Sequence, residues 1–204
     1  MSTGGYHTCA ILAADKSLVC WGQVLFDQGE VPADETFSEV SLGFYHTCAI
    51  TTDKRMLCWG DQRNDKSTAP VGSFAQVAAG FSHNCGVGDD GLVTCWGEDE
   101  AFRVAPTGSF SRVAVGTNHS CGQKLDSTLL CWGAGLTDGS CDFGAGWHCG
   151  QSAPPVGSFT DLSAGDLHSC ALSSEGQPVC WGLGTSVANC MLSGACGQSL
   201  VPAW

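Results

Sequence analysis

The sequence predicts an all-β fold, a β-propeller of five repeats whose blades are stapled by disulfides. Three observations support this prediction. A phrase of the form G-x-x-H-x-C recurs five times along the chain, and C-W-G follows each copy at a nearly constant spacing. The 204 residues include 14 cysteines, an even number. No stretch shows the sustained 3.6-residue periodicity of an amphipathic helix.

The repeats are located by the histidine of the recurring phrase. Successive histidines are separated by 39, 37, 36 and 49 residues, and an insertion over residues 134–151 lengthens the last step. A second phrase, P-x-G-x-F with one residue before it, occurs at 69–74, 105–110 and 154–159, with a looser copy at 32–37. We expect one domain over residues 1–204, with repeats at about 1–31, 32–68, 69–104, 105–153 and 154–204.

The third repeat shows the strands that we expect in each blade. Strands are expected over 74–77, 83–87 and 92–96. Asp90-Gly91 lies between the last two, and Asp-Gly readily adopts the positive φ of a hairpin turn. Repeats of about 40 residues with three or four strands are typical of propeller blades. A single blade cannot bury both of its faces, so blades must stack.

The cysteine spacing places five pairs opposite one another across these hairpins. Opposed residues of neighbouring strands have Cα atoms about 4.5–5.5 Å apart, which a disulfide can span. Each staple closes a short loop and should contribute roughly 2–3 kcal/mol. Bonds between adjacent blades are the alternative. The expected pairs are Cys9–Cys20, Cys48–Cys58, Cys85–Cys95, Cys121–Cys131 and Cys170–Cys180.

Four cysteines and the two chain ends lie outside this pattern. We expect local bonds Cys141–Cys149 in the insertion and Cys190–Cys196 in the last loop. Zinc is the rival interpretation of the cysteines, but the sequence has no C-x-x-C. Residues 201–204 resemble a truncated P-x-G-x-F phrase, and the chain begins with the residues that follow this phrase. The ends can therefore close a ring of five blades, or join one chain to the next.

The pattern G-x-x-H-x-C-A-[IL], a turn and V-x-C-W-G resembles the repeats of the regulator of chromosome condensation superfamily. It is most similar to the cysteine-bearing type, which occurs in bacterial secreted proteins and in the ectodomains of Crinkly-type plant receptor kinases. The superfamily also includes the secreted β-lactamase inhibitor protein II. The resemblance implies a propeller, usually of seven blades rather than five, and it does not imply one function.

The repeated histidines and tryptophans are interpreted as parts of the scaffold. A metal-binding ring of histidines is the alternative, but zinc needs several rings within about 2.1 Å of one point. Trp147, in the insertion, either anchors a partner or covers its own loop, and Trp204 is a second candidate interaction residue. The structural residues are His7, His46, His83, His119, His168, Trp21, Trp59, Trp96, Trp132 and Trp181.

Composition narrows the choice of partners and of compartment. Eight basic and 20 acidic residues give a net charge of −12, which disfavours nucleic acids and anionic membranes. No apolar run is long enough for membrane insertion, and no signal peptide opens the chain. The cysteine content favours an extracellular or cell-surface location. Asn118-His119-Ser120 is a candidate glycosylation sequon, and Glu98–Glu100 is interpreted as a solvated loop.

The sequence lacks the common catalytic signatures, so we expect no enzyme and no cofactor. The expected function is a non-catalytic extracellular module that binds a protein or a glycan, or assembles with copies of itself. Its working surface is expected in the irregular loops 24–35, 134–151 and 183–199. The alternative is a secreted enzyme inhibitor, which predicts one face rich in exposed aromatic residues. Nucleotide exchange on a small GTPase is disfavoured by the cysteine content.

Overall fold

The computed structural model describes residues 1–98, 104–135 and 150–183, which form fifteen β-strands and one short 3-10 helix. The chain divides into two compact units, Met1–Thr107 and Gly108–Trp204. Its organisation as a single domain stays a prediction. Among the described residues, none lies in a helix long and apolar enough to cross a membrane.

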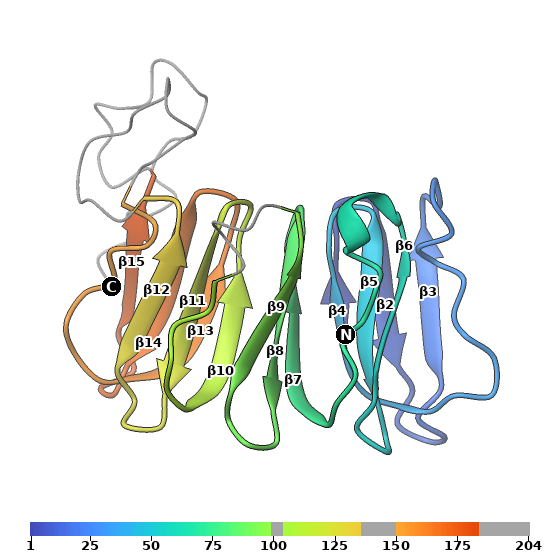
Figure 1. Ribbon diagram of the computed structural model, residues 1–204, viewed down its shortest axis with the longest axis horizontal. Coiled ribbons are helices and arrows are strands. Elements are labelled where there is room, and N and C mark those ends of the chain that lie inside the picture. The colour runs from blue at the N-terminus through green and yellow to red at the C-terminus, as the bar shows by residue number, and fades with distance from the viewer. Residues whose placement is uncertain (99–103, 136–149, 184–204) are drawn as a thin grey trace. The chain divides into compact units, whose positions relative to one another are not determined.

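The first unit contains three antiparallel sheets of three strands each, which we call blades 1, 2 and 3 (Figure 1). Strands that follow one another along the chain are neighbours in each sheet. The 3-10 helix η1 (Arg63–Asp65) lies between blades 2 and 3 in the sequence. The strands are β1 (Ser2–Thr3), β2 (His7–Ile11), β3 (Leu18–Gly22), β4 (Phe37–Leu42), β5 (His46–Thr51), β6 (Met56–Gly60), β7 (Phe74–Ala79), β8 (His83–Gly88) and β9 (Val93–Gly97).

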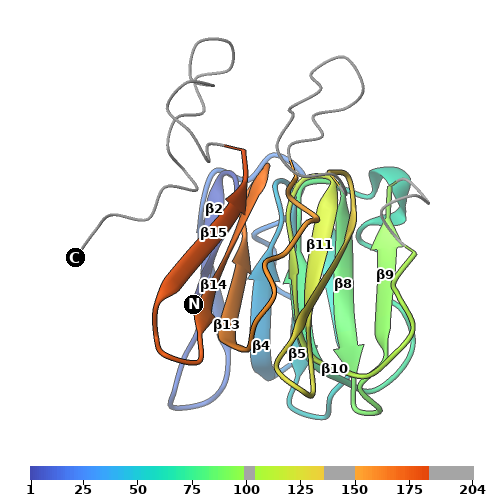
Figure 2. The ribbon, with the colours of Figure 1, turned by 90° about the vertical axis from the view of Figure 1, so that its left-hand side faces the viewer.

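The second unit contains two further sheets of the same kind, blades 4 and 5. Figure 2 shows β13, β14 and β15 as the neighbouring strands of blade 5. The strands of this unit are β10 (Phe110–Val115), β11 (His119–Lys124), β12 (Leu129–Gly133), β13 (Phe159–Ala164), β14 (His168–Ser173) and β15 (Pro178–Gly182). The expected all-β architecture of five stapled blades is confirmed. Closure of a ring stays a prediction, because residues 201–204 lie outside the described residues.

Strand alternation gives every blade two chemically distinct faces, because successive side chains of a strand point to opposite sides. In blade 2, His46 and Cys48 lie on one face, and Cys58 is the partner of Cys48 on β6. Thr47 lies on the other face, opposite Trp59. We call these the cysteine face and the tryptophan face, and the same positions define both faces in every blade.

Within each unit, the cysteine face of one blade packs against the tryptophan face of the next. Blades 1 and 2 bury Cys9 and Leu18 against Phe37, Val40 and Ala49. The same arrangement joins blades 2 and 3, and blades 4 and 5. The cysteine pairs of blades 1, 2 and 4 therefore each belong to the apolar core between two blades.

Five disulfides join directly opposed cysteines within single blades, with Cα atoms 4.0–4.1 Å apart. They are the five pairs expected from the spacing, so the alternative of bonds between blades is wrong for these ten cysteines. Cys141, Cys149, Cys190 and Cys196 lie outside the described residues, and their local pairing stays a prediction.

Candidate interaction surface

The repeated histidines join neighbouring blades by hydrogen bonds. The Nε2 atom of His7 lies 2.8 Å from the hydroxyl of Thr47, in the next blade. The ring of His119 makes the equivalent contact with Ser169 at 2.7 Å. Burial lowers the pKa of His46 to about 4, so this ring is neutral at pH 7. These contacts link neighbouring blades, and the structural role expected for the repeated histidines stays a prediction.

The tryptophans of blades 2, 3 and 5 donate hydrogen bonds to main-chain carbonyls in the segment that precedes their own blade. The indole Nε1 of Trp59 donates to the carbonyl of Gln28 at 3.1 Å. Trp96 donates likewise to Lys66, and Trp181 to Gln151. The sequence gives no sign of these acceptors, because any residue can present a main-chain carbonyl.

The loop between the first and second strands of each blade is held by backbone hydrogen bonds from two directions. In blade 2, the N–H of Gly43 donates to the carbonyl of His46 at 2.9 Å. The N–H of Asp61 donates to the carbonyl of Tyr45 at 3.0 Å. Gly60, at φ +107°, turns the chain so that this second bond forms. Side chains on the loop are therefore carried by a rigid backbone.

The loops of blades 1, 2 and 3 also lie against one another. A Cβ atom placed on Gly43 would lie 2.5 Å from the carbonyl oxygen of Gly80, the matching glycine of blade 3. The same atom on Gly4 would lie 2.4 Å from the carbonyl oxygen of Gly43. Only glycine permits this approach, which brings the loop side chains of the three blades together.

The side chains of these loops, together with Phe26 from the loop 24–35, form a contiguous aromatic cluster, which we call the aromatic surface: Tyr6, Phe26, Phe44, Tyr45 and Phe81. Neighbouring ring centroids lie 4.6–5.3 Å apart, in edge-on, tilted and stacked pairs. Tyr6, Phe26 and Phe81 remain 38–44% exposed. In blade 2, the first residue of β5, His46, pairs with the last residue of β6, Gly60. The loop before β5 therefore lies at the end of the blade where β6 ends and the chain continues to η1 (Figure 1). The aromatic surface lies at this end of blade 2.

A charged network supports one edge of the aromatic surface. The guanidinium carbon of Arg63 lies 5.0 Å from the ring centroid of Phe26, a cation–π geometry. Arg63 and Lys66 each bind the buried carboxylate of Asp61, at 2.7 and 2.8 Å. Burial alone would raise the pKa of Asp61, but these hydrogen bonds hold it well below its usual range. Arg63 is thereby fixed beside the rings.

The loop 24–35, one of the three expected working loops, contributes Phe26 to this surface. The buried side chain of Gln28 fixes it: Oε1 accepts hydrogen bonds from the N–H groups of Leu25 and Phe26, at 3.1 and 2.7 Å. Its Nε2 donates to the carbonyl of Gln23 at 3.0 Å. Leu25 is itself exposed beside Phe26. This loop is thus ordered around one glutamine.

The corresponding loops of blades 4 and 5 carry Thr117, Asn118, Asp166 and Leu167, without an aromatic ring. The carbonyl of Asn118 accepts a hydrogen bond from Ala134, and its glycosylation stays a prediction. Among the described residues, no three histidine, cysteine or acidic side chains are grouped as metal ligands would be. Trp147, Trp204 and Asp99–Glu100 lie outside the described residues, as do 136–149 and 184–199 of the other two working loops.

The sequence carried one signal for the aromatic surface. The two positions before the histidine read Gly-Tyr, Phe-Tyr and Phe-Ser in the first three copies, but Thr-Asn and Asp-Leu in the last two. The scaffold residues on either side are constant, so this variation marks side chains that the blade itself does not need.

Comparison with known proteins agrees with this architecture. The regulator of chromosome condensation (RCC1) repeat matches residues 37–65, 74–101 and 159–186. The CRINKLY WD40 ectodomain of an Arabidopsis thaliana receptor kinase is 29% identical, with a TM-score of 0.68 over 89% of this chain and 62% of that one. The entire ectodomain of a Physcomitrella patens receptor kinase is 25% identical, with a TM-score of 0.71 over 88% and 50%.

A third similar structure is Prp20p from Saccharomyces cerevisiae, a protein with binding properties toward Gsp1p and histones. It is 16% identical, with a TM-score of 0.70 over 88% of this chain and 57% of that one, and this likeness concerns the fold alone. The chain thus spans 50–62% of the length of these three structures. Fold and disulfides together define a disulfide-stapled β-propeller protein. Three of its repeats match the regulator of chromosome condensation repeat, and the disulfide within each blade makes the chain similar to the cysteine-bearing type.

Proposed function

We propose that this chain is a non-catalytic extracellular module that binds a protein partner through the aromatic surface. The observation that carries the proposal is the contiguity of five aromatic rings, on loops held by backbone hydrogen bonds. Aromatic side chains dominate the energetics of protein interfaces, and they lose little conformational entropy when the backbone is already ordered. A contiguous exposed apolar cluster is uncommon on a protein without such a role.

An extracellular location is supported by the disulfides and by the relatives. Five disulfides in one chain are typical of an oxidising compartment. The two receptor-kinase ectodomains, at 29% and 25% identity, are parts of cell-surface receptors. The net charge of −12 favours a partner with a basic rim around an apolar centre.

A secreted enzyme inhibitor is the second candidate, and the exposed aromatic surface favours it too. Aromatic side chains on loops held by hydrogen bonds are suited to insert into the active-site cleft of a hydrolase. The two candidates are distinguished by enzyme activity, because an inhibitor must stop the partner enzyme from turning over its substrate.

The test is a binding screen with a matched pair of variants. One variant replaces the exposed rings (Tyr6→Ser, Phe26→Ser, Phe81→Ser). The control replaces three exposed apolar residues outside the aromatic surface (Val71→Ser, Leu125→Ser, Val156→Ser). Both are screened against secreted proteins, cell-surface ectodomains, glycans and extracellular hydrolases.

We expect a protein ligand that binds wild type and control but not the aromatic variant. Ligands that bind all three proteins equally would place the binding site elsewhere. A ligand set made up of glycans would replace the protein partner by a carbohydrate. Inhibition of a hydrolase by wild type and control, at nanomolar concentration, would select the second candidate.

A further inference from the structure

Arg63 holds a charged group in a fixed position beside the aromatic surface. Its Nε atom donates to both oxygens of the Asp61 carboxylate, at 2.9 and 3.0 Å, and its Nη2 atom donates to Oδ2 at 2.7 Å. Its main-chain N–H also donates to this carboxylate, at 3.1 Å. One edge of the planar guanidinium is therefore occupied, and this bidentate geometry fixes the orientation of the group.

The segment that carries Arg63 is also ordered by its backbone. Asn64 and Asp65 follow with φ angles of +59° and +56°, a left-handed conformation that Asn and Asp adopt more readily than most residues. The N–H of Thr68 donates to the carbonyl of Asp65 at 2.9 Å. This segment joins blades 2 and 3, which both belong to the first unit, so the position of Arg63 relative to the aromatic surface is defined.

The buried carboxylate of Asp61 has a second cation besides Arg63. The ammonium of Lys66 lies 2.8 Å from Oδ2, and the side chains of Lys66 and Asp61 are 8% and 2% exposed. The side chain of Arg63 is 63% exposed instead. A buried charge requires a partner, and Lys66 already supplies one inside the protein. The exposed guanidinium is therefore available for a contact outside it.

The outer edge of the guanidinium has no hydrogen-bond partner among the described residues. The hydrogens of Nη1 and the second hydrogen of Nη2 point away from Asp61, because the donors of a guanidinium have a fixed planar geometry. This edge can bind one further carboxylate through two parallel hydrogen bonds. Because the guanidinium carbon lies 5.0 Å from the ring centroid of Phe26, a carboxylate bound there lies at the margin of the aromatic surface.

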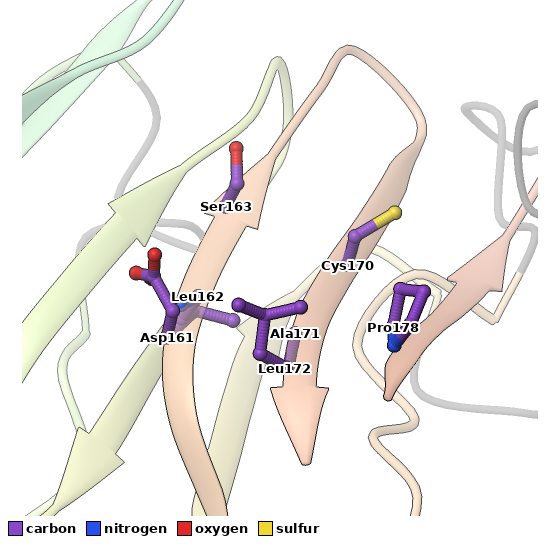
Figure 3. Close-up of a pocket in the computed structure, with 7 residues that line it drawn as sticks. All are labelled: Asp161, Leu162, Ser163, Cys170, Ala171, Leu172 and Pro178. Carbon is purple, nitrogen blue, oxygen red and sulfur yellow. Dashed lines mark hydrogen bonds between the residues drawn. The ribbon is translucent and has the colours of Figure 1, made fainter. Parts of the chain in front are cut away.

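The other arginines that the structure describes are placed differently. Arg55 lies in the turn between β5 and β6, where it pairs with two carboxylates. Arg112 pairs with Asp161, which borders a shallow apolar depression of about 130 Å³ on blade 5 (Figure 3). The residues that line this depression include no aromatic ring. Among the described arginines, only Arg63 lies against an aromatic ring.

We propose that Arg63 makes the aromatic surface specific for a protein partner that places the carboxylate of an Asp or Glu side chain directly beside an aromatic or aliphatic side chain. The apolar side chain packs on the rings, and the carboxylate binds the outer edge of the guanidinium. The inference rests on the proposed function, because it concerns the partner of the same surface.

A carboxylate suits this position better than a phosphate. Phosphate recognition usually combines several arginines, whereas Arg63 is a single one. The net charge of −12 also repels a dianion more strongly than a monoanion. The partner can still have a basic rim, since the contact with Arg63 lies beside the rings and acts at short range, where the apolar side chains exclude water.

The test uses a phage-displayed library of random peptides as the probe. The library is selected separately on wild type, on Arg63→Gln, on the aromatic variant and on Arg55→Gln. Arg55→Gln is the matched control, because it removes the same charge from another exposed arginine at the opposite end of blade 2. Far-ultraviolet circular dichroism and urea midpoints check the fold. In Arg63→Gln, Lys66 remains beside the Asp61 carboxylate.

We expect wild type and Arg55→Gln to select peptides in which Asp or Glu lies next to an aromatic or aliphatic residue. Arg63→Gln should select apolar peptides without this enrichment of acids. Equal enrichment of acids on wild type and Arg63→Gln would overturn the inference and leave the proposed function intact. Peptides that bind the aromatic variant as well as wild type, or a selection that enriches no peptide, would contradict the proposed function and the inference with it.

A double-mutant cycle then measures the contact in solution. The strongest wild-type peptide and its amide version (Glu to Gln, or Asp to Asn) are titrated by calorimetry against wild type, Arg63→Gln and Arg63→Lys. Wild type should bind the amide peptide about 10- to 100-fold more weakly. Arg63→Gln should bind the two peptides within about twofold of each other. Arg63→Lys keeps the charge but not the planar fork, so its discrimination should fall between these values. Equal losses for both peptides on Arg63→Gln would overturn the proposal, because they would mean that Arg63 only positions Phe26.

Discussion

The ring Nε2 of His46 lies 2.5 Å from Oδ1 of Asn84, and this contact joins the central strands of blades 2 and 3. The amide Nδ2 of Asn84 donates in turn to the carbonyl of Lys66, which also accepts from Trp96. One side chain thus connects the histidine of one blade, the linker and the tryptophan of the next. Because all of these groups are buried, each depends on its partner to replace water.

Removing Asn84 should therefore destabilise the first unit. Asn84→Ala leaves a buried imidazole and a buried carbonyl with fewer partners, so we expect a loss of about 1–3 kcal/mol. Thr94→Ala, at an exposed position of the same blade, is the control and should change stability little. Urea unfolding of the oxidised proteins measures both. Equal midpoints for Asn84→Ala and wild type would show that the contact contributes nothing.

Acidification should destabilise the protein through His46. Burial lowers the pKa of His46 from 6.5 to about 4 in the folded state. Between these values the unfolded chain binds a proton that the folded chain does not, so stability falls as the pH falls and levels off below about 4. Burial also lowers the pKa of His7 and His168, which adds to the loss. The contribution of His46 is on the order of 3 kcal/mol.

The measurement is a urea titration between pH 7 and pH 4.5, compared with His46→Gln. Glutamine keeps an N–H donor toward Asn84 but does not titrate in this range. The variant should be less stable at pH 7 and should show a shallower decline with acid. Parallel declines in the two proteins would assign the pH dependence to other groups.

Reduction should open the Cys170–Cys180 disulfide first. Cys9, Cys48, Cys85 and Cys121 are fully buried in their own disulfides, whereas both sulfur-bearing residues of the blade 5 pair are partly exposed. Exchange requires a thiolate to reach a sulfur atom, so access sets the order. Brief treatment with dithiothreitol, alkylation and peptide mapping should show label at Cys170 and Cys180 before any other of the ten described cysteines. Earlier labelling of a pair in blades 1–4 would contradict this order.

Local features of this fold were predictable because each depends on residues close in sequence. The spacing of Cys85 and Cys95 around the Asp90-Gly91 turn defines a hairpin and its disulfide together. The aromatic surface was not predictable in this way. It requires knowing that the loops of Tyr6, Phe44 and Phe81 meet, which depends on the stacking of three blades. The acceptors at Gln28, Lys66 and Gln151 were also hidden, because a carbonyl group can be presented by any residue.

The same substitution at two motif tryptophans, one buried and one exposed, should affect stability differently. Trp96 is 7% exposed and donates through Nε1 to the carbonyl of Lys66 at 3.1 Å. Trp96→Phe removes the donor, leaves that carbonyl with one partner fewer and creates a small void, so we expect a loss of about 1–3 kcal/mol. Trp21 occupies the same motif position in blade 1, but it is half exposed and its N–H has no partner among the described residues.

Trp21→Phe should therefore change the stability of the isolated chain by less than about 0.5 kcal/mol, as for an ordinary surface position. Denaturant unfolding at low protein concentration compares the two variants directly. A large loss for Trp21→Phe under these conditions would mean that the tryptophan face of blade 1 is already covered within the single chain.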